Sequence, residues 1–186
     1  MATPMATESG AAGASASSVA SGAASADPSI PAADTSAWTV LAPDGAGFSA
    51  RMPGEAKTST MTIKTPAGDA PTNVWSFTDA SNRMFTVTQS KFQAGTLSKA
   101  PVAKVLDGSV SGAASAMGNL TVASQTDTTL DGHAGRAFVM TSSKANVQGL
   151  VLPLGDTEYI LSVSAPAGMA DDGSAAAFFA SFKLAA

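Results

Sequence analysis

The feature that most constrains this 186-residue chain is a change of pattern at Ala37. From there onward, apolar residues recur at every second position in short runs, which Gly, Pro, Asn and Asp separate. A period of two is typical of β-strands that bury one face. Because the intervening loops are too short to hold crossover helices, the pattern predicts antiparallel meanders.

The alternating runs form two groups along the chain. The first group predicts strands at residues 38–42, 48–53, 61–65, 73–78 and 83–92, and the second at 120–130, 136–142, 147–153 and 158–165. Alternation places four large side chains of the first group on an inward face: Met61, Ile63, Trp75 and Phe77.

One helix is predicted between the two meanders and another near the C-terminus. From Pro101 to Met117, apolar residues recur at spacings of three and four and form a single stripe: Val102, Val105, Leu106, Val110, Ala113 and Met117. Asp171 or Asp172 is expected to cap a short final helix that buries Phe178, Phe179 and Phe182. We therefore predict an α+β domain over residues 37–186. It consists of a single antiparallel β-sheet from two meanders, with one central helix and a short C-terminal helix packed on it.

Residues 1–36 have a different character. They are rich in Ala, Ser and Gly, contain no aromatic residue and no Leu, and have only Val19 and Ile30 as β-branched aliphatic residues. Such a segment cannot bury enough apolar surface to offset the entropy of ordering it, so disorder is predicted. Acidic spacers of this kind resemble the start of mature bacterial lipoproteins. We therefore expect an envelope tether, with a signal peptide and a lipidated Cys upstream of Ala2; a low-complexity linker is the alternative.

Charge excludes some classes of partner. Three of the 14 acidic residues lie in the first 36 residues, which contain no basic residue, so residues 37–186 are nearly neutral. No stripe of Lys and Arg alternates with aromatic residues, so nucleic-acid binding is not expected. No apolar run approaches the roughly 20 residues that span a bilayer, so membrane contact is expected only through a lipid anchor. The absence of Cys fits a periplasmic and a cytosolic protein equally well.

Four segments together resemble a known superfamily: FSARMPGEA, LDGHAGRAF, VQGLVLPLGDTEYILSVS and AAAFFASFKL. With the order of strands and helices, they are similar to the Mog1/PsbP-like superfamily over residues 37–184, and especially to its small bacterial envelope and lipoprotein members. The resemblance implies the fold predicted above and a role in binding other proteins. Known members bind a small GTPase in one branch and photosystem subunits in another, and most bacterial members have no assigned activity.

The chain departs from the bacterial pattern at two places. At the corner, Ala134 replaces the usual proline and Ala137 the usual acidic residue. Residues 155–158 (GDTE) stand where relatives have basic residues before the tyrosine strand. Partner contacts that these positions make in relatives are therefore not carried over to this chain.

His133, the only histidine, gives the clearest candidate for catalysis. A hydrolase would use Asp131 or Asp127 to orient it and a serine as nucleophile. However, serine is so abundant that one near His133 is expected by chance, and no G-x-S-x-G motif occurs. Asp-Gly followed by a second Gly between two strands is typical of a tight corner. We therefore predict a structural role for His133, with partner contact as an alternative, and assign no catalytic residue.

No metal or cofactor is expected. One His without Cys cannot form a zinc site, and Asp171-Asp172-Gly173 lacks the spacing of a calcium loop. Asp156-Thr157-Glu158 is interpreted as a solvated hairpin turn. The glycines at 108, 112 and 118 match no phosphate-binding motif. The eight methionines are interpreted mainly as core residues rather than copper ligands.

Two aromatic residues, Trp75 and Tyr159, are expected in the packed face of the sheet, whereas Trp38 anchors the first strand or belongs to a binding surface.

These observations favour a non-enzymatic, envelope-tethered interaction or accessory domain that binds a protein partner or a small apolar ligand. The alternatives are a hydrolase with an unidentified active site and a cytosolic GTPase-binding protein. The sequence does not identify a ligand-binding residue or an oligomeric state.

Overall fold

The computed structural model of the protein describes residues 33–65 and 68–185. This part of the chain contains ten strands: β1 (Thr39–Leu41), β2 (Phe48–Met52), β3 (Lys57–Thr65), β4 (Gly68–Thr78), β5 (Met84–Lys91), β6 (Thr121–Leu130), β7 (His133–Thr141), β8 (Ala145–Leu154), β9 (Thr157–Pro166) and β10 (Lys183–Leu184). The helices are the 3₁₀ turn η1 (Leu97–Lys99), α1 (Val102–Ala116) and α2 (Ser174–Ser181). Most of the segment for which disorder was predicted, residues 1–32, lies outside the described residues.

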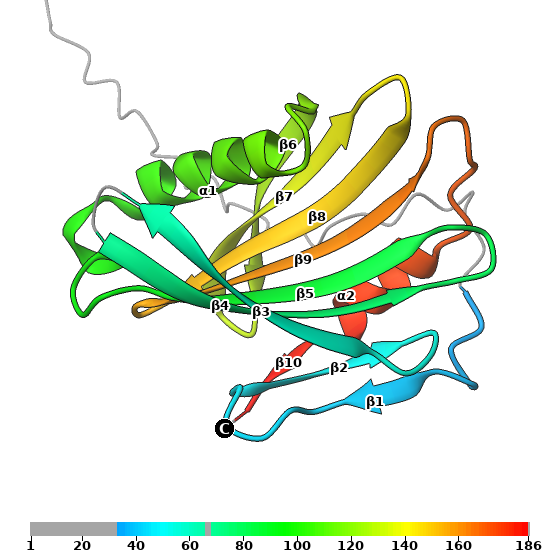
Figure 1. Ribbon diagram of the computed structural model, residues 1–186, viewed down its shortest axis with the longest axis horizontal. Helices are drawn as coiled ribbons and strands as arrows, with labels where there is room; N and C mark the ends of the chain where they lie inside the picture. The colour runs from blue at the N-terminus through cyan, green and yellow to red at the C-terminus, as the bar shows by residue number, and fades with distance from the viewer. Residues whose placement is uncertain (1–32, 66–67, 186) are drawn as a thin grey trace, which may run out of the picture.

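The strands form two sheets, so the prediction of a single sheet is wrong. Seven strands pair antiparallel in the order β3-β4-β5-β9-β8-β7-β6, and three form a separate sheet in the order β1-β2-β10. The first predicted meander is present only from β3 to β5, since its first two strands, β1 and β2, belong to the small sheet. The second, β6 to β9, is present in full, and the two join where β5 pairs with β9. Helix α1 covers one face of the large sheet, and the small sheet and α2 lie on the other face (Figure 1).

The small sheet is separate because its strands bury one face on the large sheet and pair with the far end of the chain. Phe48, Ala50 and Met52 of β2 are all buried in the core. On its edges, β2 pairs with β1 and with β10, where Lys183 is opposite Ser49. A two-residue strand formed by the last residues of the chain has too short an alternating pattern to be recognised in the sequence.

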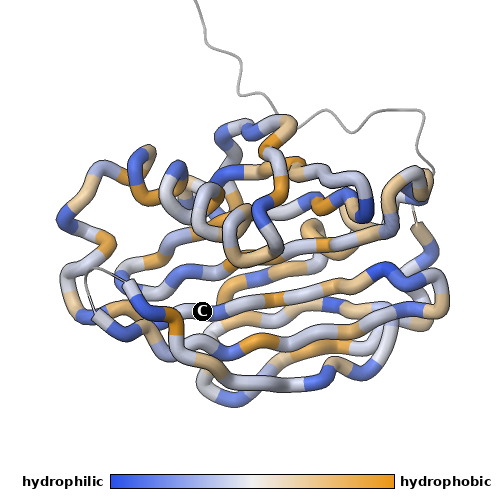
Figure 2. Tube along the Cα trace, turned by 45° about the horizontal axis from the view of Figure 1, so that its top comes forward, coloured by the Kyte–Doolittle hydropathy of each residue, from blue (hydrophilic) through white to orange (hydrophobic). Residues whose placement is uncertain are grey.

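Helix α1 confirms the predicted central helix and packs through one stripe. Leu106 and Val110 of α1 are buried against Phe138 and Met140 of β7, and Val147 and Val151 of β8 belong to the same cluster. The residues at the two ends of the predicted stripe, Val102 and Met117, are exposed and do not pack on the sheet. The helix therefore covers the β6–β9 half of this face. Hydrophobic and hydrophilic segments alternate along the strands below it (Figure 2).

The second core lies between the large sheet, the small sheet and α2. Its aromatic residues contact one another, with Phe48 beside Trp75, Tyr159 and Phe182, and Phe85 beside Phe178. The predicted burial of Trp75, Tyr159, Phe178 and Phe182 is confirmed, and Phe179 is half-buried. Phe182 follows the last residue of α2 rather than lying in it.

A buried polar network attaches the turn before β2 to the large sheet. The Tyr159 hydroxyl donates to the carbonyl of Ala46 at 2.8 Å, and Gln89 Nε2 donates to the same oxygen at 2.6 Å. Gly47, with φ of 71°, lies so close that a Cβ there would be 3.2 Å from the Tyr159 oxygen. Because buried polar atoms need partners, the network fixes Tyr159 and Gln89 in a structural role.

The expected inward positions of Met61 and Ile63 are wrong. Both lie on β3, an edge strand of the large sheet, with 56% and 40% of their surface exposed. They share a face with Thr72 and Ala70 of β4. This is the face of the sheet on which α1 lies, but α1 packs on β6, β7 and β8 and does not reach β3. Alternation identifies which residues share a face, but it does not show whether another layer covers that face.

Candidate functional site

A groove of about 470 Å³ lies between α2 and the neighbouring face of β6, β7 and β8. This volume falls within the range of about 300–1,000 Å³ that is typical of small-molecule sites. Its apolar surface comes mainly from Leu130, Ala137, Val139, Leu150, Phe179 and Ala180. We refer to it as the α2 groove.

Strand register explains why these side chains meet. Ala137 of β7 is opposite Thr126 of β6 on one side and Leu150 of β8 on the other, so the three share one face of the sheet. Helix α2 packs on β2 and β9 and leaves β6 and β7 uncovered on this face. Small side chains on the strands, such as Ala137, keep the resulting space open.

Among the described residues, those that line the α2 groove are apolar or neutral and polar, and none is charged. Alternation along the strands sends the charged Asp127 and Arg136 to the opposite face, beneath α1. On the groove side, β6 contributes the hydroxyls of Ser124, Thr126 and Thr128. Such a surface suits an apolar ligand with few polar groups, since a charged ligand would lose its hydration without gaining an ionic partner.

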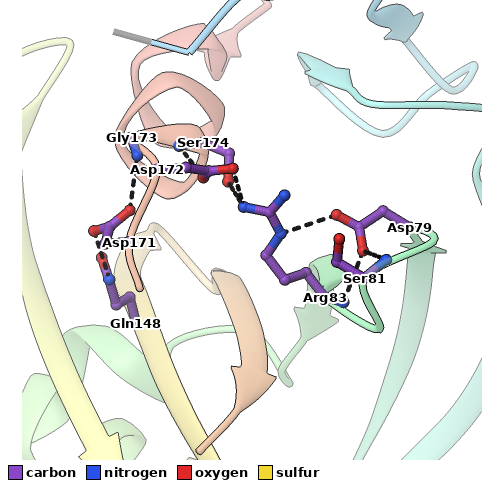
Figure 3. A network of polar contacts seen from close by, with 8 residues as sticks. All are labelled: Asp79, Ser81, Arg83, Gln148, Asp171, Asp172, Gly173 and Ser174. Carbon is purple, nitrogen blue, oxygen red and sulfur yellow. Dashed lines mark hydrogen bonds and ion pairs between the residues drawn. The ribbon is translucent and has the colours of Figure 1, made fainter. Parts of the chain in front are cut away.

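A polar cluster surrounds Arg83 near the first residues of α2 (Figure 3). Its Nε donates to Asp79 Oδ2 at 2.9 Å, its Nη1 donates to Ser174 Oγ at 3.0 Å, and it forms an ion pair with Asp172. Cavities of about 330 and 270 Å³ lie on either side of this cluster, and Trp38 lines the first. Arg83 thus connects the β4–β5 turn to the beginning of α2.

Contacts within the cluster shift two pKa values. The hydrogen bond from Arg83 lowers the pKa of Asp172 well below its usual range, and the same bond raises the pKa of Arg83. The charges of Arg83 and Asp172 therefore stabilise each other. The arrangement of the cluster fits a structural ion pair better than an acid or base in catalysis.

The start of α2 differs from the prediction that Asp171 or Asp172 caps it. Gly173, with φ of 79°, occupies the N-cap position and makes no side-chain bond. The two carboxylates instead accept backbone N–H groups two residues onward, Asp171 from Gly173 at 2.9 Å and Asp172 from Ser174 at 3.1 Å. Both aspartates are therefore engaged in holding the helix start.

His133 lies at a hairpin corner, as the sequence predicted. Asp131 and Gly132 form the turn with φ values of 49° and 79°, and His133 is exposed and opposite Leu130 at the start of β7. In the described chain, no hydrogen bond joins His133 to a carboxylate, since Asp127 binds Arg136 and Asp131 accepts the N–H of Leu184. The arrangement of a catalytic triad is not formed here.

The interpretation of Asp156-Thr157-Glu158 as a solvated hairpin turn is right about the turn, which Gly155 and Asp156 form, but wrong about solvation. Glu158 belongs to β9, retains only 6% of its exposed surface, and accepts a hydrogen bond from Ser109 of α1. Burial raises the pKa of its carboxyl group above the ordinary value, and the bond from Ser109 partly opposes that rise. Asp156 also has partners, because its carboxylate accepts the N–H groups of Gly95 and Leu97. Neither interaction leaves a signal in the local sequence.

Arg136, at the end of the corner motif, attaches α1 to the large sheet. It donates to Asp127 Oδ1 from Nε at 2.9 Å and from Nη2 at 2.7 Å, and it pairs with Asp107 of α1. Its bond to Asp127 raises its pKa. From the sequence, Asp127 was a candidate only as a partner of His133, and its pair with Arg136 was not predicted.

The other residues considered from the sequence are dispersed. Among the described residues, no group of three or more His, Cys, Asp or Glu side chains could hold a metal ion. Met52 and Met140 fill the core as expected, but Met61 and Met84 are exposed. Trp38 is half-buried and contacts Phe85 edge-on at 5.8 Å, as expected for an anchor of the first strand. None of the helices in the described ranges combines the length and apolar character of a membrane span.

Comparison with known proteins supports the fold. No family model and no curated protein matches the chain. The solution structure of PsbP (CyanoP) from Synechocystis sp. PCC 6803 matches with a TM-score of 0.53 and 10% identity, over 79% of this chain and 92% of that one. The chain therefore has a PsbP-like fold, as the resemblance implied.

Two further solved structures match more weakly. A protein of unknown function from Pseudomonas aeruginosa has a TM-score of 0.35 and 11% identity, over 69% of this chain and 82% of that one. A protein from Bacteroides thetaiotaomicron has a TM-score of 0.37 and 13% identity, over 79% of this chain and 48% of that one.

Proposed function

We propose that this protein is a non-enzymatic binding module of the bacterial cell envelope, and that the α2 groove takes an apolar ligand or an apolar segment of a protein partner. The observation that carries the proposal is the groove itself, which is about 470 Å³ in volume and has no charged side chain among its described lining residues. Concave, mostly apolar sites with a few polar groups are the usual form of binding sites.

The chemistry of the described residues supports binding rather than catalysis. Three ionisable groups that are buried or clustered in the described chain have structural partners: Arg83 with Asp172, Arg136 with Asp127, and Glu158 with Ser109. None of these groups lines the α2 groove. A general acid or base must lie within hydrogen-bond reach of the bound substrate, and the groove supplies only hydroxyl and amide groups.

The location in the envelope rests on the composition of residues 1–36. The segment has the Ala-, Ser- and Gly-rich composition of a spacer, and we assign to it the role of a tether from a lipid anchor to the domain.

A fluorescent-probe titration tests the binding function. The neutral apolar dye N-phenyl-1-naphthylamine is expected to bind the purified protein with increased emission. Ala137→Phe, which places a ring in the groove at an exposed strand position, is expected to weaken binding by about tenfold or more. Val40→Phe adds the same ring at an exposed position of β1, outside the groove, and is the matched control. Unchanged dye binding in Ala137→Phe would contradict the proposal.

A further inference from the structure

Strand β6, which forms one wall of the α2 groove, is also an open edge of the large sheet. It is the last strand in the order, and within the described part of the chain it pairs only with β7. Its two-residue turn, Asp131-Gly132, makes Leu130 and His133 the hydrogen-bonded pair that closes the hairpin. Because such pairs alternate along an antiparallel ladder, the N–H and C=O groups of Gln125, Asp127 and Thr129 are directed away from β7.

Those outward backbone groups have no partner in the described chain. No hydrogen bond is made by the N–H or C=O of Gln125, Asp127 or Thr129 to any residue in the described ranges outside the β6–β7 pair. The register shift in β6 lies between Val122 and Ser124, so the ladder from Ser124 to Leu130 is regular. This stretch is long enough to pair with an extended segment of about five residues.

The two edges of the large sheet are protected differently. On β3, Lys57 and Lys64 are exposed, and lysines on an edge strand discourage pairing with another chain. On β6, Asp127 is the single charged residue, and its carboxylate is bound by Arg136 on the face opposite the groove. The β6 edge therefore carries one ion-paired carboxylate and lacks the lysines that protect β3 against strand addition.

We propose, on the basis of the binding function above, that the partner is an extended peptide segment that adds as a strand to β6 and directs apolar side chains into the α2 groove. The unpaired backbone groups and the apolar groove lie beside each other, because Thr126, Thr128 and Leu130 of β6 line the groove. Strand addition satisfies the backbone groups, and alternate side chains supply specificity.

The uncharged lining of the groove determines which side chains the peptide should have. A charged side chain directed into the groove would be desolvated without an ionic partner, since the groove has no charged lining. Long apolar side chains reach diagonal neighbours across a strand pair, so Leu or Phe on the added strand would extend over Thr126 toward Phe179 of α2. The expected segment is uncharged over about five residues and apolar at every second one.

The test uses the full chain and a synthetic peptide, acetyl-Lys-Leu-Thr-Phe-Thr-Leu-Thr-Lys-amide, in which the lysines give solubility. Amide hydrogen exchange is measured by NMR with and without the peptide. Binding is expected to slow exchange at Gln125, Asp127 and Thr129. The same peptide with N-methyl groups on alternate residues keeps its side chains but loses backbone donors, and we expect it to bind about tenfold or more weakly.

A variant of the edge gives a second readout. Gln125→Pro removes an outward N–H without breaking the β6–β7 ladder, and the Gln125 side chain is on the face away from the groove. We expect it to bind the peptide about tenfold or more weakly, whereas Gln125→Thr, which keeps the N–H and favours a strand, should bind as the wild type does. If Gln125→Pro does not fold, the comparison of the two peptides on the wild type decides.

The outcomes separate this proposal from the binding function. If the neutral dye binds but the peptide does not, or if both peptides bind equally, strand addition is wrong and the binding function stands. If neither the dye nor the peptide binds, both proposals are wrong. Protection of the same amides by dimerisation, or by a synthetic peptide of residues 1–32, would assign the β6 edge to a second copy or to the chain itself, and would overturn the proposal.

Discussion

Glu158 is the clearest case of a single side chain whose environment determines its energetics. Its carboxyl group is buried under α1, and burial raises its pKa above the ordinary value of 4.5. The unfolded chain therefore ionises this group at a lower pH than the folded chain does. The stability that the group contributes is present below the ordinary pKa and is lost as the pH rises through the folded pKa.

Glu158→Gln is therefore expected to raise the free energy of unfolding at pH 7. Glutamine keeps the shape and accepts the hydrogen bond from Ser109, but it has no charge to desolvate. Urea unfolding at pH 7 and at pH 3.5 measures the effect, which should vanish at the lower pH. A variant that is less stable than the wild type at pH 7 would show that the ionised carboxylate is favourable in the folded state.

His133→Ala tests the structural role of the corner histidine. The side chain is exposed and makes no hydrogen bond in the described chain, so the variant should lose about 1 kcal/mol of stability or less. Binding of the neutral dye should be unchanged, because His133 does not line the α2 groove. A specific turnover that disappears in this variant while the fold is retained would favour the hydrolase alternative.

At the scale of elements, the packing of β7 on β8 requires that Gly149 has no side chain. The Phe138 ring lies over Gly149, and a Cβ there would be 2.1 Å from Phe138 Cζ. Gly149→Ala should therefore cost about 1–3 kcal/mol through overpacking of the core beneath α1. Gly112→Ala is the matched control, since nothing lies within 4 Å of its Cβ on α1, and it should gain about 0.5–1 kcal/mol. Equal effects of the two changes in thermal unfolding would contradict this packing.

The link between the β4–β5 turn and α2 depends on Arg83. The pKa of Asp172 is lowered in the folded state, so its contribution to stability is present above its ordinary pKa of 3.8 and is lost as the pH falls. Arg83→Met should lower stability at pH 7 by about 1–2 kcal/mol, because Asp79 and Asp172 lose their partner and Asp172 is half-exposed. The difference from the wild type should shrink at acidic pH, and a constant difference would exclude the ion pair as its cause.

How far the sequence predicts the elements depends on whether each signal is local. The helical stripe around Leu106 and the corner at Asp131-Gly132 are local patterns, and the structure confirms both. Pairing of β2 with β10 joins residues more than 130 positions apart, and the alternating pattern contains no information about that distance. For the same reason, the exposure of Met61 could not be predicted, since it depends on which strands α1 covers.

The candidate site could not be predicted, because its signal is the absence of large or charged side chains. The α2 groove exists where Ala137 lies between Thr126 and Leu150 on a face that α2 leaves uncovered. Small residues on strands are too common to mark a site in a sequence. The polar residues that attracted attention, Asp171 and Asp172, hold the start of α2 instead.

At the scale of the whole molecule, we propose that residues 1–36 connect a domain of PsbP-like fold to a lipid anchor. Mass analysis of the native N-terminus from the source cell tests the tether. An acylated cysteine before Ala2 is expected, and it would direct the search for partners to the envelope. An acetylated or free N-terminus at Met1 would contradict the envelope location and favour the intracellular alternative.

The central claim is that the α2 groove is the binding surface, and methyl NMR tests it most directly. With ¹³C-labelled Leu and Val methyl groups, titration with N-phenyl-1-naphthylamine is predicted to shift Leu130, Val139 and Leu150, which line the groove. Leu106 and Val110, buried beneath α1 on the other face of the sheet, should not move. Shifts confined to the α1 side, or no shift at saturating dye, would contradict the claim.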